Sequence, residues 1–129
     1  MILGVGVDIV EVVRIERSIA RHGDHFLQRV FTEGEIAYCS KVKSPGPNYA
    51  ARFAAKEAVS KAFGVGIGAQ LGWLEIEVCR KENGAPFIEL RRGSAEFARI
   101  RGARAIHLSL SHTAAYAVAQ VVIEGGGEV

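Results

Sequence analysis

Cysteine is scarce in this sequence of 129 residues. The two cysteines, Cys39 and Cys79, stand far apart, and neither belongs to a Cys-x-x-Cys pair or a cluster of cysteines and histidines. Disulfide frameworks and structural zinc sites require such spacings, so both kinds of scaffold are disfavoured. We expect both thiols to be reduced and to serve packing.

Long hydrophobic runs are missing as well. The longest apolar stretch, Met1 to Val7, stops at Asp8 and is far shorter than the roughly 20 residues that a membrane-spanning helix needs. It also lacks the basic flank and the small-residue cleavage pattern of a signal peptide. We therefore expect a cytoplasmic protein with no membrane partner.

The sequence has little excess charge of either sign. Sixteen lysines and arginines stand against 14 acidic residues, and the formal net charge of +2 is too small to indicate nucleic-acid binding. Hydrophobic residues make up 49% and charged residues 23%, which is typical of a compact globular chain. We expect a single domain over residues 1–124 and a flexible tail over 125–129.

The hydrophobic pattern predicts helices and antiparallel strands in one domain. A largely buried strand is expected at the start, and Thr32 and Glu35 have the spacing of a capping box. Residues 41–48 read as a loop in which Asn48 could cap the next helix, and Asn83-Gly84 reads as a hairpin turn. The expected strands are 2–10, 73–79, 86–90, 105–111 and 116–123, and the expected helices are 14–20, 26–30, a short one after 32, 49–63 and 94–100. The predicted fold class is α+β, with helices packed on an antiparallel sheet.

Asp8 stands in an otherwise apolar strand. A buried carboxylate without partners costs several kcal/mol, so this position calls for a metal, a cation or strong hydrogen-bond donors. The alternative is that the strand ends near Asp8, whose side chain then caps the turn or the helix that starts near Val13.

The predicted helix 49–63 has two different faces. One is a stripe of small residues, mostly alanine, that would allow close approach to a sheet. The other gathers polar side chains, namely Arg52, Lys56, Glu57, Ser60 and Lys61. Glu57 and Lys61 are four residues apart and could simply form a solvated helix ion pair. The same face would also suit a phosphate-rich ligand with a bound cation.

Two further groups of residues have both a structural and a functional interpretation. Lys61 precedes a loop with glycines at 64, 66 and 68 that could expose backbone donors to an anion, although the order is not that of a Walker loop. His112 shares a strand face with Leu108 and Leu110 and alone would be read as a hydrogen-bonded core residue. No Gly-x-Ser-x-Gly occurs, so a serine hydrolase is disfavoured.

A basic stripe lies along the predicted helix 14–20. Arg14, Arg17 and Arg21 recur at intervals of three and four residues, so they share one helix face. Such a stripe either binds an acidic partner or is merely solvated and paired with Glu11 or Glu16.

Three motifs in this order resemble the holo-acyl-carrier-protein synthase family, the small, trimeric class of phosphopantetheinyl transferases. They are Gly4-Val5-Gly6-Val7-Asp8-Ile9, Arg52-Phe53-Ala54-Ala55-Lys56-Glu57-Ala58-Val59-Ser60-Lys61-Ala62-Phe63-Gly64 and Ser109-Leu110-Ser111-His112-Thr113. The middle motif is long and specific, and the resemblance extends from about Ile2 to Val122. It implies a 4′-phosphopantetheinyl transferase-like fold and a homotrimer that supports fatty acid biosynthesis.

The resemblance also implies a reaction and its residues. The 4′-phosphopantetheine of coenzyme A would pass to a serine of apo acyl carrier protein, with Mg²⁺ held by Asp8 and Glu57 and with Lys61 as the cation that meets developing charge. The base for the serine stays open between a water on the metal and the carboxylate of Glu57 or Asp8. Coenzyme A would contact Arg52, Lys61, Gly64, Asn83, Pro86, His112 and Thr113, and the carrier protein would dock on Arg14, Arg17 and Arg21.

Two other classes remain as alternatives at this stage. A catalytically silent coenzyme A or nucleotide-binding module would use Lys61 and the glycine loop but would need no pair of metal-binding carboxylates. A purely structural trimer would carry its charges only for solvation.

Overall fold

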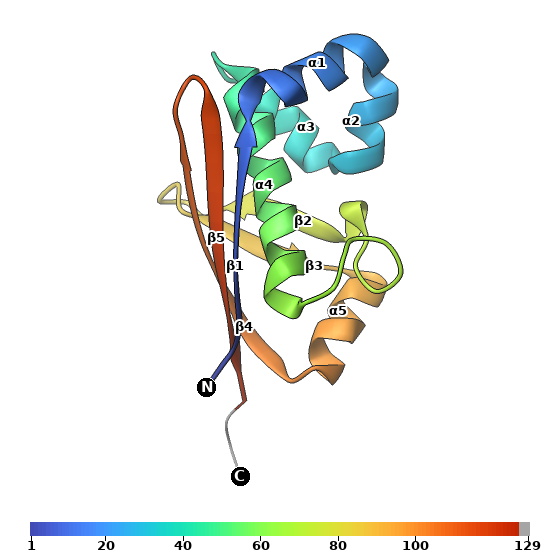
Figure 1. Cartoon of the computed structure of the whole chain (residues 1–129), viewed down its shortest axis with the longest axis vertical. Helices are drawn as coiled ribbons and strands as arrows, with labels where there is room; N and C mark the ends of the chain where they lie inside the picture. The colour runs from blue at the N-terminus through green and yellow to red at the C-terminus, as the bar shows by residue number, and fades with distance from the viewer. Residues whose placement is uncertain (127–129) are drawn as a thin grey trace.

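The computed structural model describes residues 1–126 and has the α+β architecture that the sequence predicts. Helix α4 (Pro45–Phe63) runs through the middle of the molecule. A three-stranded antiparallel sheet lies along one side of it, and the other helices and a small hairpin lie around the top and the opposite side (Figure 1). None of the helices among these residues is long and apolar enough to cross a membrane.

The strands form two separate antiparallel sheets. The larger has the order β1 (Ile2–Glu11), β5 (Tyr116–Gly125), β4 (Ala103–His112), and the smaller is the hairpin of β2 (Ile76–Arg80) and β3 (Pro86–Leu90). The remaining helices are α1 (Val12–His22), α2 (Asp24–Val30), α3 (Glu33–Cys39) and α5 (Arg92–Ile100), with a 3₁₀ turn η1 (Trp73–Glu75) before β2. Of the expected tail, Gly125 belongs to β5, the Gly126 N–H donates to the Gly102 carbonyl at 3.2 Å, and residues 127–129 lie outside the described residues.

The prediction that β1 is largely buried is wrong for the single chain. Val5, Val7 and Ile9 are 62%, 56% and 65% exposed, because α4 covers only the opposite face of the strand. On that covered face, Gly4 and Gly6 let the strand backbone touch the helix. A Cβ atom at either glycine would collide with the carbonyl oxygen of Ala62 or Ala58.

The start of α4 also differs from the prediction. The helix begins at Pro45, so the expected loop ends four residues earlier, and Asn48 does not cap the helix. The Asn48 Nδ2 instead donates to the Ser44 carbonyl at 3.0 Å. Prolines at 45 and 47 fit here because the first N–H groups of a helix have no acceptor within it. At the other end, Gly64 closes the helix in the left-handed conformation, as predicted.

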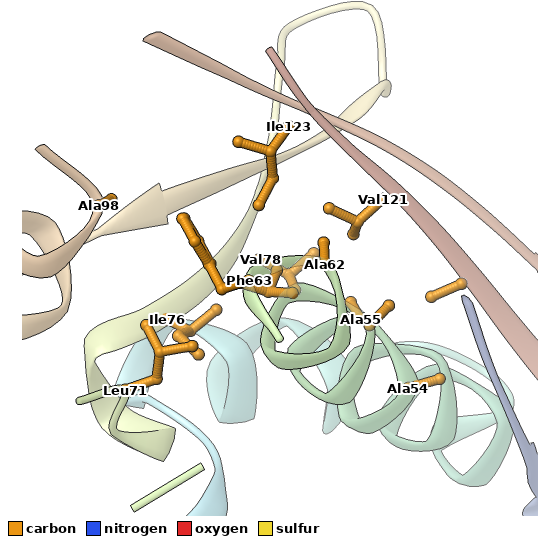
Figure 2. Close-up of a cluster of buried hydrophobic side chains, with 13 residues drawn as sticks. Ala54, Ala55, Ala62, Phe63, Leu71, Ile76, Val78, Ala98, Val121 and Ile123 are labelled. Carbon is orange, nitrogen blue, oxygen red and sulfur yellow. The ribbon is translucent and has the colours of Figure 1, made fainter. Parts of the chain in front are cut away.

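The main core lies between α4 and the large sheet. Figure 2 shows Val121 and Ile123 of β5 on the sheet side of this cluster, with Ala55, Ala62 and Phe63 of α4 opposite them. The small alanine side chains bring the helix close to the sheet, as the sequence pattern predicts.

Much of the polar side of α4 is not a solvated face. Arg52, Lys56 and Ser60 are buried. Helix α3 and strand β2 pack against α4, and Lys56 reaches the backbone of α2 and η1. The Lys56 ammonium lies 2.7 Å from Glu35 Oε1 and donates to the carbonyls of Val30 and Trp73 at 2.8 and 2.7 Å. Burial lowers the pKa of Lys56, although Glu35 opposes that shift.

Glu35 completes this network. Thr32 and Glu35 form the predicted capping box, in which the Thr32 N–H donates to Glu35 Oε1 at 2.8 Å. The second oxygen, Oε2, accepts from the Val78 N–H at 2.7 Å. The buried ion pair therefore joins α3, α4 and β2 and satisfies four backbone groups around it.

Candidate functional site

Asp8, Glu57 and Lys61 come together where β1 crosses α4. The Lys61 ammonium lies 2.9 Å from Asp8 Oδ1 and 3.2 Å from the Val7 carbonyl oxygen. Asp8 therefore has a cationic partner and does not cap a turn, and the strand continues past it to Glu11. The side chain of Asp8 is 14% exposed and that of Lys61 53% exposed, so the site opens to solvent on the lysine side.

Glu57 lies on α4 one turn before Lys61, close enough to Asp8 of β1 for the two carboxylates to repel each other. Partial burial raises the pKa of the Glu57 carboxyl, the nearby Asp8 raises it further, and Lys61 lowers it. Among residues 1–126 the Glu57 carboxylate has no hydrogen-bond or ion-pair partner, so the helix ion pair with Lys61 considered for this spacing does not form. The site thus combines two neighbouring carboxylates with one ammonium group.

This donor set fits a small divalent cation. Two carboxylates that repel each other are stabilised by a positive charge between them, and carboxylate oxygens are the ligands that Mg²⁺ prefers. Mg²⁺ also commonly takes only one or two protein carboxylates and fills its remaining positions with water and substrate phosphates. The residues present are therefore sufficient for a magnesium site that is completed by a phosphate ligand.

A second group of possible ligands does not form a comparable site. Glu77, Cys79 and Glu89 place ligand atoms within 4.8 Å of one another. The Arg91 guanidinium already donates to both carboxylates, and burial and the neighbouring acids raise the pKa of the Cys79 thiol to about 11. The thiol is therefore protonated, and one arginine occupies both carboxylates and cancels one of their two charges.

Arg52 and Gly64 flank the two ends of this segment of α4. The Arg52 guanidinium donates from Nη1 to the Asn48 carbonyl at 3.3 Å and lies 4.5 Å from the centre of the Tyr38 ring. Its buried Nε has no partner within the described part of the chain. Arg80 lies over the same ring at 5.0 Å, a grouping of Tyr38 with two arginines that no sequence spacing indicates. Gly64 is exposed and follows the Lys61 turn.

The other predicted coenzyme A residues lie elsewhere in the chain. Asn83 and Pro86 are at the β2–β3 turn, where Asn83 Oδ1 accepts from the Ala85 N–H at 3.0 Å. His112 is exposed at the end of β4, and the Thr113 hydroxyl accepts from the Tyr116 N–H at 3.0 Å in the β4–β5 turn. None of the four has a hydrogen bond or ion pair to Asp8, Glu57 or Lys61 within residues 1–126. One chain therefore does not assemble the whole predicted set.

The basic stripe of α1 is confirmed as an exposed surface. Val12 and Ile15 are buried on the other side of the helix. Arg14, Arg17 and Arg21 all face solvent. None of the three pairs with Glu11, Glu16 or another carboxylate among the described residues. Unpaired arginines on one helix face leave a positive surface available to an acidic partner.

Comparisons with known proteins identify the class. Residues 4–121 match the family model of the 4′-phosphopantetheinyl transferase superfamily, and the chain belongs to that superfamily. Within it, the relatives are holo-[acyl-carrier-protein] synthases. The protein of that name from Koribacter versatilis is 48% identical to this chain, over 96% of this chain and 99% of its own length. The one from Moorella thermoacetica is also 48% identical, over 95% of this chain and 94% of its own length.

Solved structures of such enzymes share the fold. The holo-(acyl-carrier-protein) synthase of Bacillus anthracis in complex with CoA (3′,5′-ADP) is 39% identical, with a TM-score of 0.81 over 98% of this chain and 99% of that one. The Helicobacter pylori enzyme in complex with coenzyme A is 37% identical, with a TM-score of 0.83 over 93% and 99%. The Neisseria meningitidis enzyme is 32% identical, with a TM-score of 0.90 over 96% of this chain and 99% of that one.

Proposed function

We propose that this chain transfers 4′-phosphopantetheine from coenzyme A to a serine of apo acyl carrier protein, leaving holo carrier protein and adenosine 3′,5′-bisphosphate. The observation that carries the proposal is the meeting of Asp8, Glu57 and Lys61 in a chain of this superfamily. A silent coenzyme A-binding module would have no need for the two carboxylates. The reaction serves fatty acid biosynthesis, and we place the enzyme with its substrates in the cytoplasm.

In this proposal the carboxylates of Asp8 and Glu57 would hold Mg²⁺, which would supply Lewis-acid charge neutralisation at the pyrophosphate of coenzyme A. The serine oxygen forms a bond to the β-phosphorus while the bond from that phosphorus to the oxygen of the leaving bisphosphate breaks. The half-exposed ammonium of Lys61 is able to swing toward the phosphates and stabilise the charge that develops on them.

The serine proton must pass to a base as the bond to phosphorus forms. The Asp8 and Glu57 carboxylates and water in the site are the candidates. His112 is not proposed as this base: it has no hydrogen bond or ion pair to Asp8, Glu57 or Lys61 within the described chain, and its proposed role is to contact coenzyme A.

The direct test is a mass measurement. Apo acyl carrier protein is incubated with the chain, coenzyme A and magnesium, and the carrier is then weighed by mass spectrometry. The carrier is expected to gain one 4′-phosphopantetheine group, and a carrier whose target serine is replaced by alanine should gain nothing. A native carrier of unchanged mass would contradict the proposed function.

The carrier protein is proposed to dock on the arginines of α1. Acyl carrier proteins would have to be acidic where they meet this helix, and charges at the rim of an interface mainly govern encounter. In Arg14→Glu/Arg17→Glu, the KM for carrier protein should rise about tenfold or more and the KM for coenzyme A should change little. Steady-state kinetics with each substrate varied in turn measures both constants.

Arg99→Glu is the control for this charge reversal. Arg99 lies on α5 and pairs with Glu96. Its reversal changes the net charge as much as one of the α1 replacements and should leave both KM values near native. Added salt should weaken carrier binding in the native chain. An unaltered carrier KM in the double variant would remove α1 from the docking model.

A homotrimer is proposed on the basis of the exposed apolar face of the large sheet. Val5, Val7 and Ile9 line up there with Val122, Gln120 and Val118 of β5. An exposed sheet face of this kind, apolar except for Gln120, commonly marks an interface between subunits. Identical chains that repeat one heterologous contact form a ring when the rotation between neighbours closes, and an open filament when it does not. Such a ring would also allow His112 and the β2–β3 turn of one chain to approach the carboxylates of its neighbour.

Mixed assembly tests this shared site. Glu57→Ala and His112→Ala are first assayed separately, because the test requires that each be severely impaired alone. They are then unfolded together and refolded, so that some interfaces combine an intact Glu57 with an intact His112. Transfer activity should return to a measurable fraction of native, while either variant refolded alone stays inactive. The mixture's mass is checked by light scattering. Mixed trimers without any recovery would show that both residues serve the site of the same chain.

A further inference from the structure

Lys61 is already bound to the carboxylate that the proposed metal site needs. Its ammonium lies 2.9 Å from Asp8 Oδ1, and the Val7 carbonyl at 3.2 Å holds it in place. Asp8 is mostly covered, whereas Lys61 is half exposed. The lysine is therefore the partner that is free to leave, since its long side chain can turn toward solvent without uncovering the core.

The net charge of the site makes this contact consequential. Asp8 and Glu57 contribute two negative charges, and Lys61 cancels one of them. A divalent cation that approaches the pair meets an ammonium already seated on Asp8, and like charges a few ångströms apart repel strongly in a partly dehydrated site. Cation binding and the Asp8–Lys61 ion pair are thus opposed.

We infer that Lys61 competes with the divalent cation for Asp8, and that the phosphates of coenzyme A relieve the competition by drawing the ammonium away. The inference deepens the proposed function and rests on its assignment of the metal to Asp8 and Glu57. It gives Lys61 a second role besides meeting charge in the transition state: it weakens metal binding until a phosphate ligand arrives. Metal and coenzyme A then bind with positive coupling, and each strengthens the other by the same factor.

The test measures cation binding directly, without transfer. Mn²⁺ serves as the probe at pH 8 and low ionic strength, and free Mn²⁺ is followed by electron paramagnetic resonance. In the absence of coenzyme A, Lys61→Met should bind Mn²⁺ about tenfold more tightly than the native chain, because the competing charge is gone and the length of the side chain is kept. Lys61→Arg, which keeps the charge, should bind like the native chain.

Two controls separate this effect from general electrostatics. Arg99→Met removes the same formal charge from a residue whose partner is Glu96, and its Mn²⁺ affinity should stay within about twofold of native. The double variant Lys61→Met/Asp8→Asn should not bind Mn²⁺ more tightly than the native chain, since the Asp8 carboxylate for which the two cations compete is replaced by a neutral amide. Circular dichroism establishes that each variant is folded, which is expected because residue 61 is half exposed.

The coupling is measured in the same assay with coenzyme A present and carrier protein absent. Coenzyme A should tighten Mn²⁺ binding more in the native chain than in Lys61→Met. Lys61→Met that binds Mn²⁺ no more tightly than the native chain, or not at all, would overturn the inference, even if the transfer assay succeeds. A failed transfer assay together with tighter Mn²⁺ binding would reject the proposed function and leave the competition standing.

Discussion

Glu57→Gln and Asp8→Asn should each lower the transfer rate by on the order of 10³-fold or more, since each removes a charged metal ligand while keeping the shape of the side chain. Neither carboxylate belongs to the hydrophobic core, so both variants should unfold near the native temperature. The rate is measured at saturating coenzyme A and carrier protein over a range of magnesium concentrations. Raising magnesium should recover little of the lost rate.

Glu96→Gln is the matched control for this pair. Glu96 is exposed on α5 and pairs only with Arg99 among the described residues, so losing its charge should leave the rate near native. A rate close to native in Glu57→Gln or Asp8→Asn at saturating magnesium would refute the metal-ligand assignment for that residue.

Lys56→Met should have the largest effect on stability. It leaves Glu35 as a buried carboxylate without its cation and leaves the carbonyls of Val30 and Trp73 without their donor. Breaking a buried ion pair in this way typically costs about 3–5 kcal/mol of the free energy of unfolding. Urea denaturation followed by circular dichroism measures the loss, and the exposed Lys41→Met should change stability by less than about 0.5 kcal/mol.

The double variant Lys56→Met/Glu35→Leu makes this prediction sharper. Replacing both members of a buried ion pair by apolar residues often leaves the free energy of unfolding unchanged. Here the pair also satisfies four backbone groups, and each group left buried without a partner costs about 1–3 kcal/mol. The double variant should therefore remain less stable than native by at least about 2 kcal/mol. Native stability in the double variant would mean that the backbone groups find other partners.

Much of the secondary structure could be predicted because its signals are local. The capping box at Thr32, the glycine that ends α4 and the hairpin around Asn83-Gly84 all appear in the structure. The turn of this hairpin is longer than the two residues predicted: β2 ends at Arg80, β3 begins at Pro86, and the Gly84 N–H donates to the Lys81 carbonyl at 2.9 Å. The predicted start of α4 at residue 49 is too late, because prolines, which usually end helices, are also tolerated in the first turn. The burial of β1 could not be judged from its apolar residues alone, since composition does not say whether one face or both are covered.

The site could be predicted in part, for a comparable reason. Asp8 in an apolar strand indicates that a cation lies nearby, and the helical spacing places Glu57 and Lys61 on one helix face. The polar side of α4 nevertheless divides into two environments that periodicity cannot separate. Lys56 turns inward to Glu35, whereas Lys61 turns to Asp8, because different elements pack over successive turns of the helix. Those neighbours lie far away in the sequence.

The contacts of Gly4 and Gly6 with α4 set the alignment of β1 along the helix. Two residues of a strand span about 6.6 Å, and four residues of a helix span about 6 Å. Two glycines two apart therefore match Ala62 and Ala58, which are four apart. A slip of one residue would bring side chains into the helix backbone, so only one alignment keeps both contacts. The two glycines thereby fix the position of the Asp8 carboxylate along α4. They also fix its spacing from Glu57 and Lys61.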